Sequence, residues 1–186
     1  MPEPVFTVAN QLTLLRMGLA PLLVVLVLSQ QHVWALVTFV LAGLSDALDG
    51  LIARRGGQQT TLGAMLDPIA DKVLLGSAYV ALTWGNTVSC AIPVWLTVTL
   101  LARDAITVVS VAVINLTVGR RVFAPSILGK AATGAQILTA GLVLLANAMG
   151  ECPPYLAWVF RITIVLIVTS ALHYVYVASV RPSELS

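Results

Sequence analysis

Apolar residues fall into six long runs along the chain, separated by short polar connections. Each run holds roughly 20 residues or more, which at about 1.5 Å per helical residue is enough to cross a hydrocarbon core of about 30 Å. The runs cover residues 10–29, 33–55, 61–84, 91–117, 125–149 and 154–178. The pattern therefore predicts an all-α integral membrane protein with six transmembrane helices.

The connections between the runs are short, and no low-complexity or repeated segment interrupts them. We therefore predict a single transmembrane domain over residues 1–186. Pro2 and Pro4 alternate with apolar residues before the first run, which fits either a short interfacial segment or a frayed terminus. The first run is expected to stay in the mature protein, because it lacks the basic start and the small-residue cleavage site of a signal peptide.

Composition and charge support a bilayer location and give it an orientation. Of the 186 residues, 59% are hydrophobic and only 10% are charged, whereas soluble domains carry about 25% charged residues. Basic residues flank the connections and ends on one side only, namely Arg54, Arg55, Arg120, Arg121, Lys130 and Arg181. Positive residues are retained in the cytoplasm, so both termini are predicted there, in a cell inner membrane or a mitochondrial-type inner membrane. The basic rim suits membrane lipids and phosphorylated substrates, and a net charge of +2 gives no indication of nucleic acid.

The two cysteines, Cys90 and Cys152, both lie at the predicted outer side. An oxidising compartment there would be able to join them. Small apolar residues near helix ends are more often simply packed, so two unpaired cysteines are the favoured expectation.

Four aspartates lie inside the second and third runs, at Asp46, Asp49, Asp67 and Asp71. Spacings of three and four residues place each pair on one face of its helix. Counted from the short turn between the two runs, Asp49 and Asp67 lie about 10 Å along their helices, and Asp46 and Asp71 about 15 Å. An antiparallel hairpin would therefore gather all four carboxylates into an active site between helices two and three, near the cytoplasmic face.

Four carboxylates at close range in a poorly polarisable site repel one another, so the site needs positive charge. Arg54 and Lys72 are the basic residues expected nearby, and no His or Cys favours zinc. An all-oxygen ligand set selects Mg²⁺, Mn²⁺ or Ca²⁺, and two ions sharing the carboxylates would satisfy it. Gly50, Ala53 and Gly63 would let the helices approach closely, and Arg54 suits phosphate oxygens. Taken singly, the small residues are usual packing devices and Arg54 an ordinary anchor.

Residues 46–71 read Asp-x2-Asp-Gly-x2-Ala-Arg-x8-Gly-x3-Asp-x3-Asp. This resembles the signature of the CDP-alcohol phosphotransferase family, integral membrane enzymes that make phospholipids, with every spacing intact. The resemblance implies two divalent ions, Mg²⁺ or Mn²⁺, held by Asp46, Asp49, Asp67 and Asp71, with Asp71 also the general base. It further implies CDP contacts from Asp49, Gly50, Ala53, Arg54 and Gly63.

Three further segments resemble phosphatidylglycerolphosphate synthases and eukaryotic-type cardiolipin synthases. They are Asn10-x-Leu12-Thr13-x2-Arg16, Arg103-Asp104 and Gly129-Lys130-x2-Thr133-x2-Gln136. This implies phosphatidyl transfer from CDP-diacylglycerol to glycerol 3-phosphate, or alternatively to phosphatidylglycerol, with release of CMP by a homodimer. The candidate acceptor-binding residues are Arg103 and, on one expected helical face, Lys130, Thr133 and Gln136. The alternatives are an Arg103–Asp104 pair and a snorkelling anchor at Lys130.

Intramembrane carboxylates also occur in cation channels and transporters, which form the alternative class. Those proteins place their sites near the midplane with access from both sides, whereas here the acids cluster toward one face beside Arg54. A purely structural protein would have no use for these charges. Of the remaining polar residues, Arg161 is expected to be structural, and His32 and His173 to be inert interfacial residues.

Overall fold

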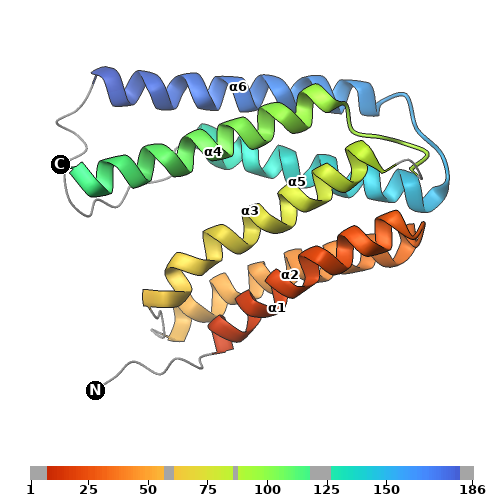
Figure 1. The fold of residues 1–186 in the computed structure, drawn as a ribbon, viewed down its shortest axis with the longest axis horizontal. Helices are drawn as coiled ribbons and strands as arrows, with labels where there is room; N and C mark the ends of the chain where they lie inside the picture. Colours follow the sequence, from red (N-terminus) through yellow and green to blue (C-terminus); the bar gives the residue numbers. More distant parts are fainter. Residues whose placement is uncertain (1–7, 57–60, 86–87, 118–126, 181–186) are drawn as a thin grey trace. The chain divides into compact units, whose positions relative to one another are not determined.

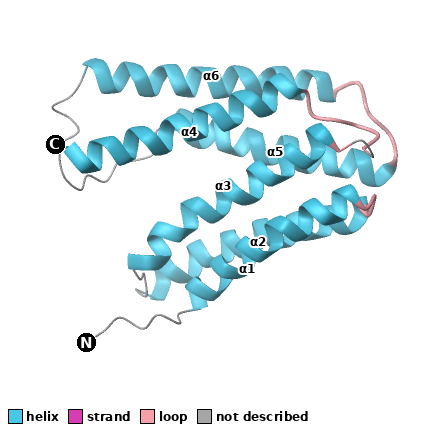
Figure 2. Cartoon of the chain, viewed as in Figure 1, coloured by secondary structure: helices cyan, strands magenta, loops and turns pink. Residues whose placement is uncertain are grey.

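The computed structural model describes residues 8–56, 61–85, 88–117 and 127–180, and this part of the chain forms six α-helices (Figure 1). The helices are α1 (Val8–Leu28), α2 (His32–Gly56), α3 (Thr61–Trp84), α4 (Val94–Thr117), α5 (Ile127–Met149) and α6 (Leu156–Val180). The described residues contain no strand (Figure 2). The all-α prediction is confirmed, and the helix ends agree with the apolar runs to within three residues.

Local signals end the helices where the apolar runs stop. Gln30 follows α1 with a φ of 62°, the left-handed conformation that commonly closes a helix. Gly150 does the same after α5 with a φ of 74°, and the N–H of Glu151 donates to the carbonyl oxygen of Ala146 at 3.1 Å. Gly85 follows α3, where a Cβ atom would lie 2.5 Å from the carbonyl oxygen of Ala81. Only glycine therefore fits this turn without displacing backbone.

The chain divides into two compact units. The first unit comprises residues 1–91 and 140–153, and in it α1 packs against both α2 and α3. The second comprises residues 92–139 and 154–186, and in it α4 packs against α6. In that second unit the buried hydroxyls of Thr139 and Thr163 are hydrogen-bonded at 2.8 Å.

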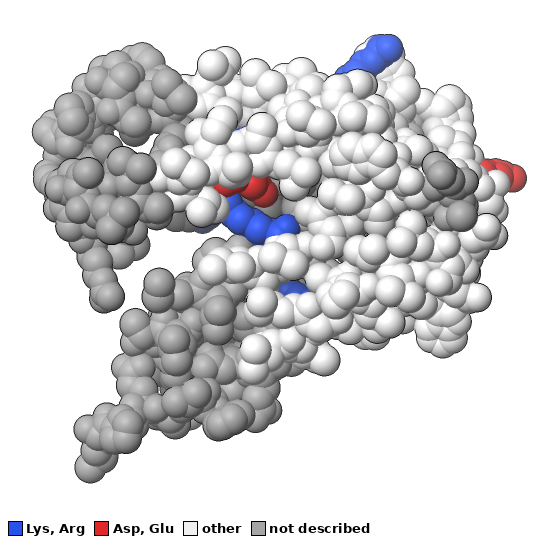
Figure 3. All heavy atoms as spheres, viewed as in Figure 1, with Lys and Arg blue, Asp and Glu red and all other residues white. Residues whose placement is uncertain are grey.

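Apolar side chains lie on the outside of the helices as well as in the core. Trp34, Ile127, Leu138 and Trp158 are all at least 60% exposed, and most side chains on the face in Figure 3 are neither acidic nor basic. Among the described residues, two helical stretches are long and apolar enough to cross a membrane by length and composition, Ile127–Met149 and Leu156–His173. The expectation of long apolar helices is confirmed, while the count of six spans stays a prediction.

Cys90 and Cys152 form a disulfide, so the favoured expectation of two unpaired cysteines was wrong. The connection after α3 is folded back onto the end of α5 by Asn147, which is 4% exposed. The Asn147 side-chain oxygen accepts the Cys90 N–H at 3.0 Å, and its amide nitrogen donates to the Cys90 carbonyl oxygen at 2.8 Å. The Asn147 clamp joins residues 57 apart in sequence, and the disulfide joins residues 62 apart.

Candidate metal and substrate site

The aspartate pairs lie on two consecutive helices, as the sequence predicts. Asp46 and Asp49 fall within α2, and Asp67 and Asp71 within α3. Helical backbone at these positions puts each pair on one helix face. Of these side chains the structure describes Asp71. The side chains of Asp46, Asp49, Gly50, Ala53, Arg54, Gly63 and Asp67 lie outside the described part. Convergence of all four carboxylates therefore remains a prediction.

Asp71 forms an ion pair that the sequence analysis missed. Arg16 on α1 donates from Nη1 to Asp71 Oδ1 at 2.5 Å. The Arg16 side chain is only 1% exposed, whereas that of Asp71 is 46% exposed. The expectation that Arg54 and Lys72 supply the nearby positive charge was therefore incomplete.

The depth of the two residues explains why they meet. Within the first unit, α1 and α3 begin at the same end (Figure 1). Arg16 lies about 12 Å along α1, and Asp71 about 15 Å along α3. Arg16 interrupts an apolar run, which is the same signal that singled out the aspartates. Applying that signal to helix one would have identified it.

Arg103, a candidate acceptor-binding residue in the second unit, is already engaged within its own unit. Its Nη1 donates to Asp104 Oδ1 at 2.8 Å, and its Nη2 to the hydroxyl of Ser170 on α6 at 3.5 Å. Both members of the ion pair are largely buried, at 16% and 15% exposure. The alternative of an Arg103–Asp104 pair is confirmed, and a role toward the acceptor stays a prediction.

The other acceptor candidates lie on α5 and do not share one face. Lys130 and Thr133 are exposed, and the Thr133 hydroxyl donates to the carbonyl oxygen of Gly129 at 3.1 Å. Gln136 is 1% exposed. At about 100° per helical residue, Gln136 is turned about 120° from Lys130, so the expectation of one face was wrong for it. Lys130 and Thr133 remain open to a substrate or to lipid headgroups.

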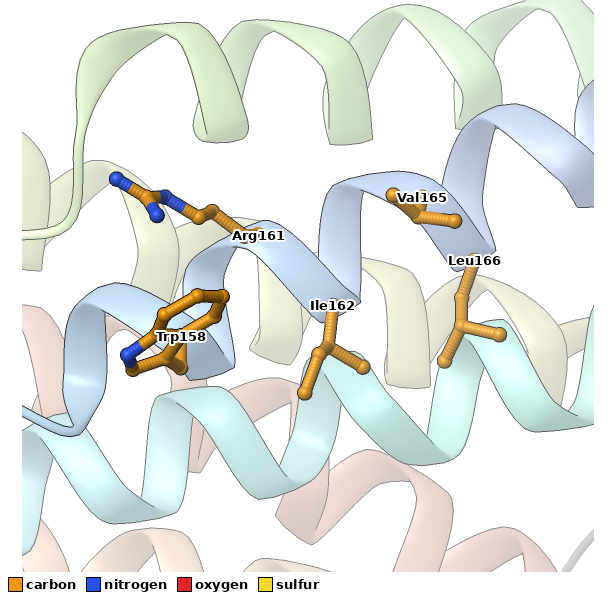
Figure 4. Close-up of a pocket in the computed structure, with 5 residues that line it drawn as sticks. All are labelled: Trp158, Arg161, Ile162, Val165 and Leu166. Atoms are coloured by element: carbon orange, nitrogen blue, oxygen red, sulfur yellow. The ribbon is translucent and has the colours of Figure 1, made fainter.

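A shallow hollow of about 260 Å³ runs along α6 and does not resemble a metal site. It is lined by Trp158, Arg161, Ile162, Val165 and Leu166 (Figure 4). The Arg161 guanidinium lies 5.0 Å from the centroid of the Trp158 ring, a cation–π contact. None of the lining residues is acidic, and this setting fits the structural role expected for Arg161. Among the described side chains, no group of three or more His, Cys, Asp or Glu is placed to hold a metal ion.

Comparisons with known proteins match most of the chain. Residues 6–176 match the family model described as CDP-alcohol phosphatidyltransferase. The chain is 38% identical over 157 residues to the cardiolipin synthase (CMP-forming) of Streptomyces coelicolor, an overlap that covers 80% of this chain and 69% of that protein. It is 43% identical over 110 residues to the human cardiolipin synthase (CMP-forming), covering 59% and 35%.

A third relative carries a different name. The chain is 38% identical over 144 residues to the "Probable phosphatidylglycerophosphate synthase" of Mycobacterium tuberculosis, covering 74% of this chain and 65% of that protein. The chain thus spans 65–69% of the length of these bacterial relatives and 35% of that of the human one.

Proposed function

The chain belongs to the CDP-alcohol phosphatidyltransferase family, and we propose that it transfers the phosphatidyl group of CDP-diacylglycerol to a glycerol-type acceptor with release of CMP. The observation that carries this proposal is the complete aspartate motif on α2 and α3, whose last carboxylate, Asp71, is paired with a buried arginine. The relatives named for CMP-forming lipid synthesis support it. The protein is accordingly a transferase of phospholipid biosynthesis.

Glycerol 3-phosphate is the proposed acceptor, and phosphatidylglycerol is the second candidate. Each is favoured by relatives, since one group is named phosphatidylglycerophosphate synthase and another cardiolipin synthase. Both acceptors carry a phosphate. Arg103, Lys130 and Thr133 are the proposed acceptor-binding residues, with the two cations supplying charge to that phosphate and the Thr133 hydroxyl contributing a hydrogen bond. The buried Gln136 is left out of this set.

The proposed setting is a multi-pass membrane protein with six spans and both termini in the cytoplasm. Every helix has 21 to 25 residues, a length of about 31–38 Å that crosses a typical bilayer. Exposed apolar side chains on α1, α2, α5 and α6 support contact with lipid. We place the active site near the cytoplasmic side, in a single domain over residues 1–186 that works as a homodimer.

The donor set fits a divalent metal. The four motif side chains, Asp46, Asp49, Asp67 and Asp71, offer carboxylate oxygens alone, and the described carboxylate of Asp71 is nearly half exposed, so a ligand can reach it. We propose that these residues hold two Mg²⁺ or Mn²⁺ ions. When bound, such ions neutralise charge on the pyrophosphate and on the departing CMP.

The chain's own residues then perform the transfer. Asp71 takes the proton from the acceptor hydroxyl, whose oxygen forms a bond to the phosphorus bearing diacylglycerol. The bond from that phosphorus to the CMP oxygen breaks, and Arg54 binds oxygens of the departing phosphate. Gly50, Ala53 and Gly63, with no side chain beyond a methyl group, leave room for the CDP moiety beside Asp49.

A CMP-release assay tests the proposal. Purified protein is incubated with Mn²⁺ and labelled CDP-diacylglycerol, and glycerol 3-phosphate, phosphatidylglycerol, inositol phosphate and serine are compared as acceptors. We expect metal-dependent CMP release with glycerol 3-phosphate, and its loss in an Asp49→Asn variant. A cation channel or transporter would release no CMP. Activity with serine or inositol phosphate alone would overturn the proposed acceptor class and leave the chemistry standing.

A further inference from the structure

Arg16 is the largest fully buried side chain among the described residues. A charged group so deep in an apolar helix is costly unless it is paired, and such groups in membrane helices mark functional sites. Its recorded ion-pair partner is Asp71, the carboxylate that the proposed mechanism uses both as metal ligand and as general base. The pair joins α1 to α3 across 55 residues of sequence.

The packing of the two helices determines where the Arg16 side chain lies. Buried residues follow Arg16 along α1 at intervals of four, three and four, and they are Ala20, Leu23 and Val27. Buried residues follow Asp71 along α3 at the same intervals, and they are Leu75, Ala78 and Leu82. Each series follows one helix face, and α1 packs on α3. The ion pair therefore stands at the start of two buried apolar stripes of equal spacing, one on each of two helices that pack together.

We propose that Arg16 is a positioning residue that fixes the carboxylate of Asp71 for the reaction. By binding Oδ1, the guanidinium restricts rotation of the carboxylate and adds a positive charge that belongs to the protein itself. A carboxylate has two oxygens with about four acceptor sites, so it still binds a metal ion or a proton while one oxygen is held. The inference rests on the proposed function, since it assigns Arg16 a role through Asp71.

Arginine suits this role better than lysine. Its guanidinium is planar, stays charged and offers several donors in a fixed arrangement, whereas lysine supplies a single point charge on a flexible stem. Outer partners that orient a ligating side chain typically change metal affinity or activity about 10- to 100-fold when removed. Arg16→Gln should therefore lower kcat by about that factor, and Arg16→Lys should recover part of the loss.

The experiment uses the full chain purified in detergent, with CMP release measured at saturating Mn²⁺. For Arg16→Gln we expect kcat to fall about 10- to 100-fold and KM for CDP-diacylglycerol to change less than about threefold. A loss seen in kcat and not in KM indicates an interaction that is needed for the chemical step. Leu23→Ala is the matched control, since it weakens the same α1 stripe without touching the ion pair. It should lower the unfolding temperature and leave kcat within about twofold. A wild-type kcat in Arg16→Gln would overturn the proposal.

A second measurement does not depend on activity. Unfolding temperatures are compared in EDTA for wild type, Arg16→Gln, Asp71→Asn and the double variant. Substitutions at coupled residues have non-additive effects. The drop in unfolding temperature caused by Arg16→Gln should therefore be less than half as large in the Asp71→Asn protein as in the wild type. Additive shifts would show that the two residues are not coupled, and would overturn the proposal that Arg16 acts through its ion pair with Asp71.

The remaining outcomes are also decisive. If the Arg16→Gln protein does not fold, the Arg16→Lys protein is assayed instead. A wild-type kcat in Arg16→Lys would then overturn the proposal, and a reduced kcat at normal expression would support it. If the wild-type protein releases no CMP with any acceptor, the proposed function fails. The cycle in EDTA then still reports whether Arg16 and Asp71 are coupled.

Discussion

Replacing Asn147 with leucine tests the clamp that holds together the connection after α3 and the end of α5 in the first unit. Leucine has the same branching and the same number of side-chain heavy atoms as asparagine, so the change removes hydrogen bonds without opening a cavity. It deletes the two bonds to the Cys90 backbone, at 3.0 and 2.8 Å, and the bond from the Asn147 amide to the Val143 carbonyl oxygen at 2.9 Å. Cys90 is 1% exposed, so its N–H and carbonyl oxygen would be left buried without these partners.

The expected cost follows from those two backbone groups. An unsatisfied buried donor or acceptor costs about 1–3 kcal/mol, so two of them cost about 2–6 kcal/mol. The connection after α3 can shift partly toward water, which favours the lower half of that range. For a chain of this length, each 1 kcal/mol lowers the unfolding temperature by roughly 2–4 °C, so a cost of about 2–4 kcal/mol in Asn147→Leu should lower it by about 4–16 °C.

Thermal unfolding of the oxidised protein in detergent measures this shift. Thr169→Val is the control, because the exposed Thr169 hydroxyl bonds only the carbonyl oxygen of Val165 in its own helix, and its loss should shift the midpoint by less than about 2 °C. An Asn147→Leu protein that unfolds within 1–2 °C or so of wild type would refute the reasoning that Asn147 satisfies the Cys90 backbone.

Other outcomes check the disulfide, the turn after α3 and the metal. Peptide mass spectrometry of the untreated protein should find Cys90 joined to Cys152, and replacing both with alanine should lower the unfolding temperature. The chain-entropy term for their separation of 62 residues is about 4 kcal/mol. Gly85→Ala should lower the free energy of unfolding by about 1–3 kcal/mol, measured by chemical denaturation, because the new Cβ would lie 2.5 Å from a backbone oxygen. An unchanged free energy of unfolding would contradict this backbone geometry. EDTA should abolish CMP release, and Mn²⁺ should restore it. Asp49→Asn should lower kcat at least about 100-fold, and normal turnover would remove the aspartates from the mechanism.

The positions of the helices were predictable because each apolar run in the sequence is about as long as the helix that forms from it. The ends of α3 match the run over residues 61–84. The placement of the aspartates on α2 and α3 was equally accessible, since it needs only helical periodicity within one hairpin. What the sequence reveals here is local: which residues are helical, and which of them share a face with near neighbours.

Contacts between distant helices were the part that sequence reasoning missed. The Arg16–Asp71 pair and the Cys90–Cys152 disulfide join segments 55 and 62 residues apart. The ion pair depends on how α1 and α3 are rotated against each other, and the disulfide on how two connections meet. Tertiary packing decides both, and local pattern does not. The Gln136 error has a different origin, because helical periodicity alone turns that residue about 120° from Lys130, and its burial agrees with that offset.

The disulfide and the ion pair hold α3 at two points. The covalent link lies beyond its C-terminal end and joins the connection after α3 to the connection after α5. The Arg16 ion pair lies in its N-terminal half and joins it to α1. A helix held at two points resists tilting, so the carboxylate of Asp71 should keep its place relative to α1 while substrates enter and products leave.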